Sequence, residues 1–276
     1  MCGRYVIIST LEKVEKRFEV KANNASDHEV NVNVAIGEKA PIVTNTEPQQ
    51  LQFFRFGFTP SWAEKASYLI NARSEGNFNK ENAMNYTGSK GILQKPMFKQ
   101  AIRQQRCLVI ADAFIEGPEK ERLSKPYVVY PTNEGSPFAM AGIWSTWHNP
   151  KTSEDENNFA ILTTAANSLL AKIGHHRAPL ILNPEDEKIW LDSEAKLSDI
   201  TSLMRPFNSK TFNAYPIDPA IKKVGNKEPE LLQPLGQRVI PEYQYEIYKE
   251  LVVRGMGQTR ARIRKEKDEG TQGLLF

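Results

Sequence analysis

Cys2 is the residue of this sequence with the most distinctive chemistry. It directly follows the initiator Met1, and removal of that methionine would leave a free α-amine and a thiol on one residue. The amine titrates near about 7.7–8.0 and the thiol near about 8.5, so both are partly nucleophilic at neutral pH. Such a 1,2-aminothiol condenses with an aldehyde to an imine, which the thiolate then closes to a thiazolidine. The simple alternative is that Cys2 is an inert residue at the start of an ordinary chain.

The two residues after Cys2 could support chemistry at this position. Gly3 leaves space for close approach to the nucleophile. Arg4 places a permanent cation two residues away, which suits a phosphate. Trp62, in a turn after a predicted strand, is either a core residue or a surface on which a base could stack.

Candidate acids and bases occur further along the chain. Glu116 ends a β-rich run, and a buried glutamate can be tuned to hold the proton that imine formation needs. His175 and His176 have the near-neutral pKa that suits proton transfer. Each also has a structural interpretation, because Glu116 could simply end a strand and the histidines could lie in a surface loop.

The elements that must position these residues are mostly short strands. Alternating or continuous apolar runs, bounded by Gly, Pro and Asn, predict strands at 41–44, 51–58, 106–115, 126–130, 138–147, 158–164, 179–182 and 212–217. Helical spacing and capping residues, among them a capping-box match at Ser9–Glu12, predict helices at 10–19, 96–105, 184–191, 194–204 and 241–254. Residues 20–40 read as irregular and 76–95 as a surface loop. This pattern predicts an α+β fold on a mainly antiparallel sheet.

Composition restricts the class of protein. The chain has 276 residues, 40% hydrophobic and 25% charged, with a net charge of 36 − 33 = +3, which is compatible with nucleic acid. No apolar run is long enough for a membrane span, and no secretory signal is evident. Two cysteines give no disulfide framework, so we expect a cytoplasmic protein with reduced thiols. We expect no metal or other cofactor, since no zinc-ligand spacing or phosphate-binding glycine loop occurs.

Composition also changes near the end of the chain. From Gly255 onward the sequence is basic and polar, with too little apolar content for a core. We therefore expect one domain over residues 1–254 and a basic tail over 255–276.

Several motifs, taken in order, resemble one protein family. They are Met1-Cys2-Gly3-Arg4-Tyr5, Thr59-Pro60-Ser61-Trp62-Ala63, Asn71-Ala72-Arg73-Ser74-Glu75, the 106–117 run, Gly142-Ile143-Trp144, Thr163-Thr164-Ala165-Ala166-Asn167 and His175-His176-Arg177-Ala178-Pro179. This ordered set, over about residues 2 to 236, resembles the SRAP family of SOS-response-associated peptidases or abasic-site-processing proteins. The resemblance implies an α+β fold with a central, mainly antiparallel β-barrel-like core. It also implies a monomer near replicating DNA that crosslinks its mature N-terminal Cys to abasic sites in single-stranded DNA, as a thiazolidine.

The resemblance implies roles for matching positions. Cys2 matches the nucleophile, and its exposure by self-removal of Met1 would be the "peptidase" activity. Asn71 matches the residue that orients the abasic sugar and the terminal amine, Glu116 the acid/base, and His175 the family's histidine. Arg4, Arg73 and Arg177 match phosphate contacts. An extra residue, Gly174, precedes the histidines, so His176 is a possible substitute for His175.

Two other functions remain open at this point. Met-Cys-Gly also begins the class-II glutamine amidotransferases, whose N-terminal amine activates the cysteine, although those chains usually continue with Ile where Arg4 stands here. The second alternative is a non-covalent single-strand-binding or adaptor module in which Cys2 is inert.

The last five residues suggest a partner. Gln272–Phe276 resembles the short peptides that dock into bacterial sliding clamps, with a flexible tether before it. The alternative is a terminus whose Leu and Phe fold back on the domain.

Overall fold

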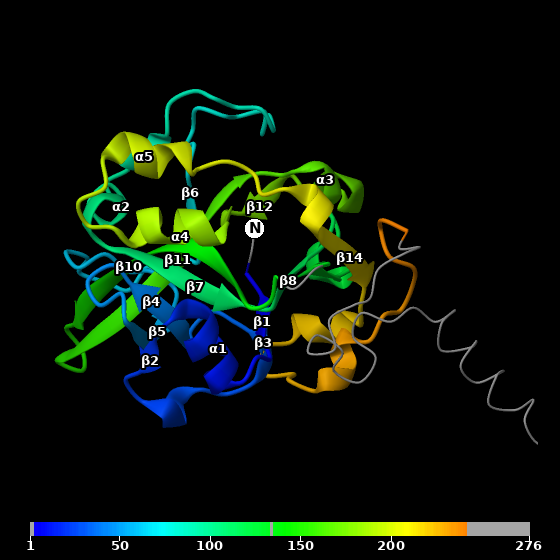
Figure 1. Cartoon of the computed structure of the whole chain (residues 1–276), viewed down its shortest axis with the longest axis horizontal. Helices are drawn as coiled ribbons and strands as arrows, with labels where there is room; N and C mark the ends of the chain where they lie inside the picture. Colours follow the sequence, from blue (N-terminus) through cyan, green and yellow to red (C-terminus); the bar gives the residue numbers. More distant parts are fainter. Residues whose placement is uncertain (1–2, 133–134, 242–276) are drawn as a thin grey trace, which may run out of the picture.

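The computed structural model of the chain describes residues 3–132 and 135–241. It has an α+β fold, in which two β-sheets carry most of the core and short helices lie at the periphery (Figure 1). None of the helices in these residues is long and apolar enough to cross a membrane. Cys2 lies outside the described residues. So do the tail and all but the first residue of the helix predicted at 241–254, with the boundary between them.

The smaller sheet has five antiparallel strands and contains the start of the chain. They are β1 (Tyr5–Ile7), β3 (Asn31–Val34), β8 (Ala113–Glu116), β9 (Tyr127–Pro131) and β14 (Phe212–Pro216). The strand order is β14-β9-β8-β1-β3. Tyr5 pairs with Phe114, so the first strand of the protein lies directly beside β8.

The larger sheet has nine strands. They are β2 (Lys21–Ala22), β4 (Lys39–Thr44), β5 (Gln50–Phe56), β6 (Asn71–Arg73), β7 (Arg106–Ala111), β10 (Phe138–Asn149), β11 (Glu154–Ala165), β12 (Arg177–Pro179) and β13 (Ile181–Leu182). Five of them pair in a closed ring, β11-β10-β7-β4-β5, because β5 returns to pair with β11 in parallel. The expected β-barrel-like core is thus a five-stranded barrel, and closure removes the unpaired edges of these five strands.

Aromatic and small residues fill the barrel where it closes. Phe56 and Phe159, which are register partners on β5 and β11, stack with ring centroids 5.2 Å apart. On the neighbouring strands Gly142 faces Cys107, and a Cβ at Gly142 would meet the Cys107 sulfur at 2.7 Å. Cys107 is therefore fully buried in the barrel wall, and burial raises the pKa of its thiol.

The helices are short, and one of them has clear sequence signals at both ends. They are α1 (Leu11–Phe18), α2 (Ala101–Gln104), α3 (Ser168–Ile173), α4 (Pro184–Leu191) and α5 (Leu197–Ser202). Six single-turn 3-10 helices are η1 (Ala25–Asp27), η2 (Gly91–Leu93), η3 (Arg122–Ser124), η4 (Ser209–Thr211), η5 (Pro219–Lys222) and η6 (Pro229–Leu232). Asn167 caps α3 by accepting from the Leu170 amide at 3.1 Å, and Gly174 ends it with φ of 84°, a conformation that favours glycine.

Asp112 separates two strands that the sequence predicted as one. The 106–115 run is continuous in composition, yet β7 belongs to the larger sheet and β8 to the smaller one. The fully buried Asp112 carboxylate accepts from the amides of Ile8 and Ser9, at 2.6 and 2.7 Å, and from the hydroxyls of Ser9 and Ser136. This carboxylate therefore holds the carboxyl end of β1 at the junction of the two sheets.

Several sequence predictions need correction. Residues 31–34, read as irregular, form the fully buried β3, and α3 was not expected. The helix expected over 96–105 is only α2, and that expected over 194–204 is only α5. Thr10 rather than Ser9 caps α1, accepting from the Lys13 amide at 3.3 Å.

Candidate active site

Glu116 and His175 form a buried pair between the end of β8 and the end of α3. The Glu116 Oε2 lies 3.4 Å from the His175 Nε2, and the two residues are 5% and 7% exposed. His175 Nδ1 lies 2.8 Å from the Gly117 carbonyl, which can only accept, so Nδ1 carries a hydrogen. The other ring nitrogen, Nε2, therefore faces the Glu116 carboxyl.

Burial sets the protonation of this pair. Desolvation raises the pKa of Glu116 to about 7 and lowers that of His175 to about 4. At neutral pH the imidazole is accordingly neutral, and Glu116 is divided between its acid and its carboxylate. The group of this pair that gains or loses a proton near neutral pH is therefore Glu116.

His176 points to a different neighbour. Its Nδ1 lies 3.2 Å from the carboxylate of Glu119, and both side chains are partly exposed. Gly174 brings the two histidines to the 116–119 segment, because its carbonyl accepts from the Glu119 amide at 3.0 Å. Of the two candidates, His175 is the one that contacts Glu116.

The start of the chain lies against the same segment. The carbonyl of Arg4 accepts from the Ile115 amide at 2.9 Å, so Arg4 is held one residue away from Glu116 along β8. The Arg4 guanidinium is half-buried, and its NH1 donates to the Gly3 carbonyl at 3.1 Å. The β1–β8 pairing therefore brings the described N-terminal residues to the acid.

The Asn-Ala-Arg motif and the His-His-Arg motif flank one strand. Arg73 on β6 is the register partner of Thr163 on β11, and Arg177 on β12 is the partner of Ala165 two residues further on. Asn71 begins β6 and donates to the Ile70 carbonyl at 3.0 Å. The carboxyl end of β11 thus gathers the two arginines.

Arg177 lies in the interior, where Glu75 is its ion-pair partner. Its guanidinium binds Glu75 with both nitrogens, NH2 to Oε2 at 2.9 Å and NH1 to Oε1 at 3.3 Å, and the Arg177 side chain is 3% exposed. Burial alone would raise the pKa of Glu75, but the hydrogen bonds and charge of Arg177 hold it at about 2. Glu75 is therefore an ionised partner of Arg177 at neutral pH.

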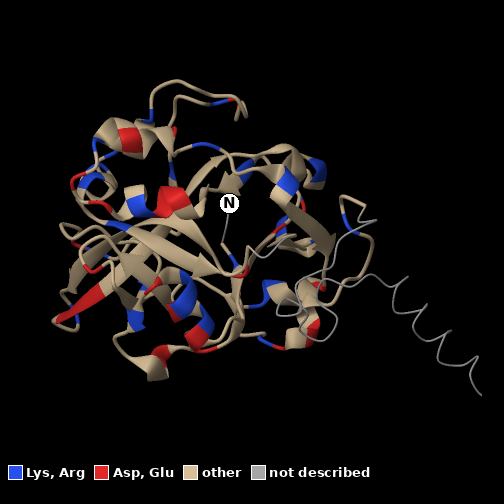
Figure 2. Cartoon of the chain, viewed as in Figure 1, with Lys and Arg blue, Asp and Glu red and all other residues tan. Residues whose placement is uncertain are grey.

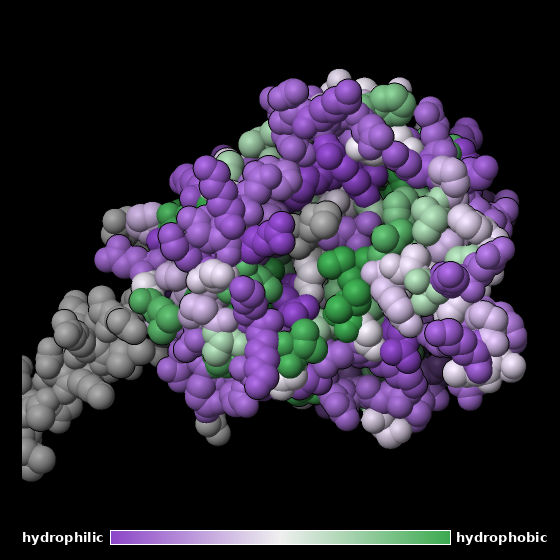
Figure 3. Space-filling view, turned by 180° about the vertical axis from the view of Figure 1, so that it is seen from behind, coloured by the Kyte–Doolittle hydropathy of each residue, from purple (hydrophilic) through white to green (hydrophobic). Residues whose placement is uncertain are grey.

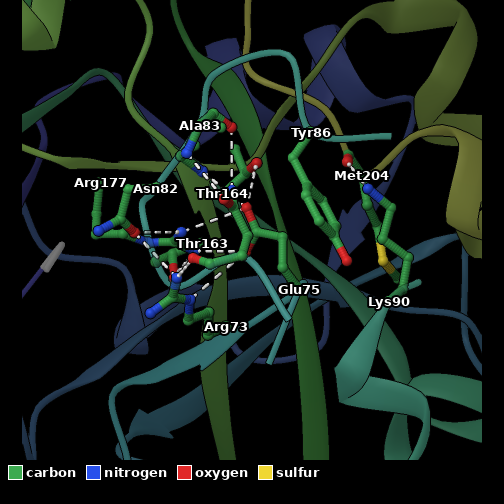
Figure 4. A network of polar contacts seen from close by, with 12 residues as sticks. Arg73, Glu75, Asn82, Ala83, Tyr86, Lys90, Thr163, Thr164, Arg177 and Met204 are labelled. Atoms are coloured by element: carbon green, nitrogen blue, oxygen red, sulfur yellow. Dashed lines mark hydrogen bonds and ion pairs between the residues drawn. The ribbon is translucent and has the colours of Figure 1, made fainter. Parts of the chain in front are cut away.

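A loop covers both arginines (Figure 4). Arg73 donates to the carbonyl of Asn79 and to Asn82 Oδ1, the latter at 3.0 Å. Arg177 NH1 reaches the same Asn82 oxygen at 3.3 Å. Oxygen atoms of the protein therefore already accept hydrogen bonds from the Arg73 guanidinium.

Trp62 lies on the surface, not in the core. It is 57% exposed, in the turn that follows β5. Trp147 holds that turn in place, because its indole nitrogen donates to the Ala63 carbonyl at 2.6 Å. An exposed ring on an anchored turn is available for stacking.

Sequence reasoning missed three contributors to this site. The Gly117 carbonyl fixes the His175 tautomer, Glu75 binds Arg177, and Asn82 bridges the arginines. Glu75 ended the Asn-Ala-Arg-Ser-Glu motif without a role of its own, and it also lies 3.9 Å from Arg73. Asn82 had no sequence signal beyond its place in a polar loop.

The surface charges and shape add two constraints. Lys and Arg residues are interspersed with Asp and Glu in the view of Figure 2, so an anionic partner would depend on particular arginines rather than on one basic face. The opposite face is hollowed, with apolar side chains on its floor and hydrophilic ones at its rim (Figure 3). Within the part of the chain that the structure describes, no group of three or more His, Cys, Asp or Glu side chains could hold a metal ion.

The fold and site define an α+β barrel protein with a buried acid–imidazole pair beside its N-terminal strand. The family model described as "SOS response associated peptidase (SRAP)" matches residues 1–224, and the chain belongs to this family.

Named relatives agree with this assignment. The abasic site processing protein YoqW of Bacillus subtilis strain 168 is 28% identical over 239 residues, which are 84% of this chain and 99% of that one. The abasic site processing protein HMCES of Gallus gallus is 30% identical over 205 residues, 67% of this chain and 57% of the relative. A crystal structure of a protein from Bacteroides thetaiotaomicron has a TM-score of 0.71 at 27% identity, covering 84% of this chain and 99% of that one.

Proposed function

We propose that this protein processes abasic sites in single-stranded DNA, by forming a thiazolidine crosslink through Cys2 after Met1 is removed. The observation that carries the proposal is the Glu116–His175 pair, whose acid titrates at about pH 7 beside the first described residues. Arg4 lies next to Ile115, and two residues span at most about 7 Å. The proposal requires Cys2 to act at this pair. The names of YoqW and HMCES support the same substrate.

The chemistry assigns a step to each group. The Cys2 amine adds to the aldehyde carbon of the opened abasic sugar, and the resulting carbinolamine loses its hydroxyl as water, taking a proton from Glu116. Loss of water leaves an iminium ion and the Glu116 carboxylate. The Cys2 thiol returns a proton to that carboxylate as its sulfur adds to the iminium carbon, so the nitrogen becomes the ring amine. The balance is aldehyde plus aminothiol giving thiazolidine plus one water. Because proton transfer requires a group with a pKa near the working pH, Glu116 suits this role.

We assign His175 the role of a hydrogen-bond acceptor for Glu116. Its lowered pKa makes it a neutral acceptor for the Glu116 proton rather than an independent acid. Opening of the sugar hemiacetal needs a proton on the ring oxygen, and we assign it to the pair, with Glu116 holding the proton and His175 orienting it.

The remaining residues would bind the strand. Arg4 and Arg73 suit backbone phosphates, Asn71 the abasic sugar, and the exposed Trp62 a neighbouring base. Arg177 already binds Glu75 through both nitrogens of its guanidinium fork, so only its NH1, which also reaches Asn82, would extend to a phosphate. The hollow face, with its apolar floor and polar rim, suits flat bases on a charged backbone (Figure 3).

The test is the intact mass of the purified protein, alone and after incubation with a single strand containing one abasic site. We expect loss of Met1, then a gain equal to the strand minus one water, stable on a denaturing gel. Cys2→Ala should bind the strand without a stable adduct, while Cys2→Ser should yield an adduct only when the imine is reduced. An undiminished crosslink with Cys2→Ala would refute the thiazolidine mechanism.

The same samples distinguish the other candidate functions. Ammonia release from glutamine would indicate amidotransferase chemistry at Cys2. Binding without any covalent product, unchanged by Cys2→Ala, would indicate a non-covalent single-strand-binding module.

A further inference from the structure

Arg73 and Arg177, beside β11, form a cationic site in which both guanidinium groups donate to the neutral side-chain oxygen of Asn82. Asn82 Oδ1 accepts from Arg73 at 3.0 Å and from Arg177 at 3.3 Å, and the Asn79 carbonyl also accepts from Arg73 (Figure 4). Two guanidinium groups and one ionised Glu75 leave a formal charge of 2 − 1 = +1. Two donors converging on one oxygen are the arrangement that an anion such as phosphate would use.

The turn that supplies these oxygens is organised by its own hydrogen bonds. Asn79 Oδ1 accepts from the Ala83 amide at 2.8 Å, and Asn79 Nδ2 donates to the Ala83 carbonyl at 3.0 Å. The Asn82 amide donates to the Asn79 carbonyl at 3.2 Å, with Asn82 in the left-handed region at φ of 53°. Asparagine tolerates that conformation better than most residues. The sequence of the turn therefore presents Asn82 to the arginines in the folded protein.

This turn belongs to a long loop whose base is fixed. The segment between β6 and η2 projects from the body of the molecule (Figure 1). Its ends meet where Gly76 and Gly91 touch, since a Cβ on Gly76 would lie 2.9 Å from the Gly91 Cα. The Ile92 amide also donates to the Ser74 carbonyl at 3.1 Å. The tip can therefore move without displacing β6.

Polar contacts rather than apolar packing hold the tip down. Phe78 and Met84, the large apolar residues of the loop, are 51% and 41% exposed. The bonds from Arg73 and Arg177 to the turn thus tie the tip to the sheet. Phosphate can compete for them, because its negative charge adds Coulomb attraction to the guanidinium groups that the neutral Asn82 oxygen lacks.

We propose that Asn82 is an internal stand-in for a DNA phosphate, and that a bound backbone phosphate displaces it from Arg73 and Arg177. The inference rests on the proposed function and adds a device that regulates it. In the free protein the turn keeps the cationic site satisfied. In the complex the phosphate binds the two arginines and the turn moves away from them. Each strand that binds must therefore replace the hydrogen bonds that Asn82 accepts in the free protein.

Two substitutions at one position separate this proposal from a positioning role. Asn82→Ala removes the competing oxygen and should tighten binding by about 3- to 10-fold, the size of one exchanged hydrogen bond. Asn82→Asp adds a negative charge, brings the site to zero charge, and should weaken binding by about 10-fold or more. It should also flatten the log–log salt dependence by about 0.7, one phosphate contact on a single strand. Asn85→Ala and Asn85→Asp make the same changes at an exposed position of the same loop and serve as controls.

The probe is a single strand with a tetrahydrofuran abasic analogue, which cannot open to an aldehyde and so reports binding without crosslinking. Hydrogen exchange gives a second measurement, in which the Ala83 and Tyr86 amides of the wild-type protein should lose protection when the strand binds. Weaker binding by Asn82→Ala would show that Asn82 only positions Arg73, and would overturn the proposal. Equal effects of Asn82→Asp and Asn85→Asp would overturn it as well. Absence of binding by the wild-type protein would instead refute the proposed function, and this inference with it.

Discussion

Glu116 owes its proton near neutral pH to burial at the end of β8. Since its pKa is about 7, the crosslinking rate should follow a bell-shaped pH profile whose descending limb reports this acid. Glu116→Gln removes the proton and should slow crosslinking by about 10²-fold or more while binding is retained. The measurement is the single-turnover rate between pH 5 and 9, with the exposed Glu119→Gln as control. A descending limb near pH 7 that survives in Glu116→Gln would assign the acid to another group.

The two histidines should behave differently when they are replaced. His175→Ala removes the neutral acceptor 3.4 Å from Glu116 and should slow crosslinking by about 10²-fold. His176→Ala removes only a contact with the exposed Glu119 and should stay within about 3-fold of wild type. Rates of the two variants, measured in parallel on the same strand, check the assignment. The reverse order of effects would make His176 the functional residue.

The Arg177–Glu75 pair should matter more for folding than a surface pair. Arg177→Met preserves much of the volume but leaves the buried Glu75 with only the more distant Arg73, at 3.9 Å, as an ion-pair partner, which costs about 3–5 kcal/mol at neutral pH. The wild-type Glu75, with its pKa held at about 2, contributes stability above its ordinary value of 4.5 and loses it as the pH falls toward 2. In the variant burial raises this pKa, so protonation relieves the cost, and the stability gap should shrink as the pH falls through 4.5.

Urea unfolding at pH 7 and pH 4 measures that gap. Arg205→Ala is the control, because Arg205 is exposed and lies 3.4 Å from Asp186, a kind of pair worth about 0–1 kcal/mol. An equal loss for the two variants at pH 7 would contradict the buried-charge argument.

The principal catalytic candidates could be predicted from sequence, whereas their partners could not. Glu116 and His175 stood in motifs whose order resembled a family, and the structure brings them to 3.4 Å. Their pKa values could not be predicted, since burial is a property of the folded chain. Arg177 was predicted to contact phosphate, and nothing local revealed that Glu75, 102 residues away, binds it.

At the scale of elements, the contacts of Asp112 hold β1 in register with β8. Asp112→Ala would remove the acceptor of the buried Ser9 amide and of the partly buried Ile8 amide, at about 1–3 kcal/mol for a buried one. We expect a loss of several kcal/mol in urea unfolding, and slower crosslinking because Arg4 is positioned by the same strand. Asp155→Ala, at an exposed partner of His148, is the matched control. Unchanged stability of Asp112→Ala would show that other contacts position β1.

The strands with clear alternation or long apolar runs were predicted well, and those without them were not. β5, β10 and β11 combine such runs with turn residues, so their positions followed from the sequence. β3 reads Asn31-Val32-Asn33-Val34, and its asparagines suggested a loop, yet all four residues are buried. Asn33 is buried because it donates to the carbonyls of Ile221, Lys223 and Asn226, which are distant in sequence. Tertiary hydrogen bonds therefore decided an element that local preference misassigned.

At the scale of the whole molecule, closure of the barrel was beyond sequence reasoning. A mainly antiparallel, barrel-like core was expected, and the ring of five strands confirms it. The contact that closes the ring is a parallel pairing of β5 with β11, made through Arg55–Asn158 and Phe56–Phe159. Strand patterns give no information about which edges meet, because pairing between distant segments depends on the path of the intervening chain.

The clamp-binding hypothesis concerns residues outside those described and remains a prediction. A fluorescent peptide of residues 262–276 should bind a bacterial sliding clamp saturably below about 100 μM, equivalent to about −5.5 kcal/mol. Removal of Gln272–Phe276 from the protein should leave crosslinking to naked abasic DNA unchanged, because the proposed chemistry lies upstream. Titration without saturation up to that concentration would end the proposal.

The burial of Cys107 limits how many thiols of the native protein can react with an alkylating reagent. The chain has two cysteines, and the barrel wall encloses Cys107 and raises its pKa. Alkylation requires an accessible thiolate, so the native protein offers at most one reactive sulfur. A maleimide or disulfide dye should thus label a single position without any cysteine being removed, and full denaturation should reveal the second. The ratio of the dye bound before denaturation to the dye bound after it would measure the folded fraction of a preparation.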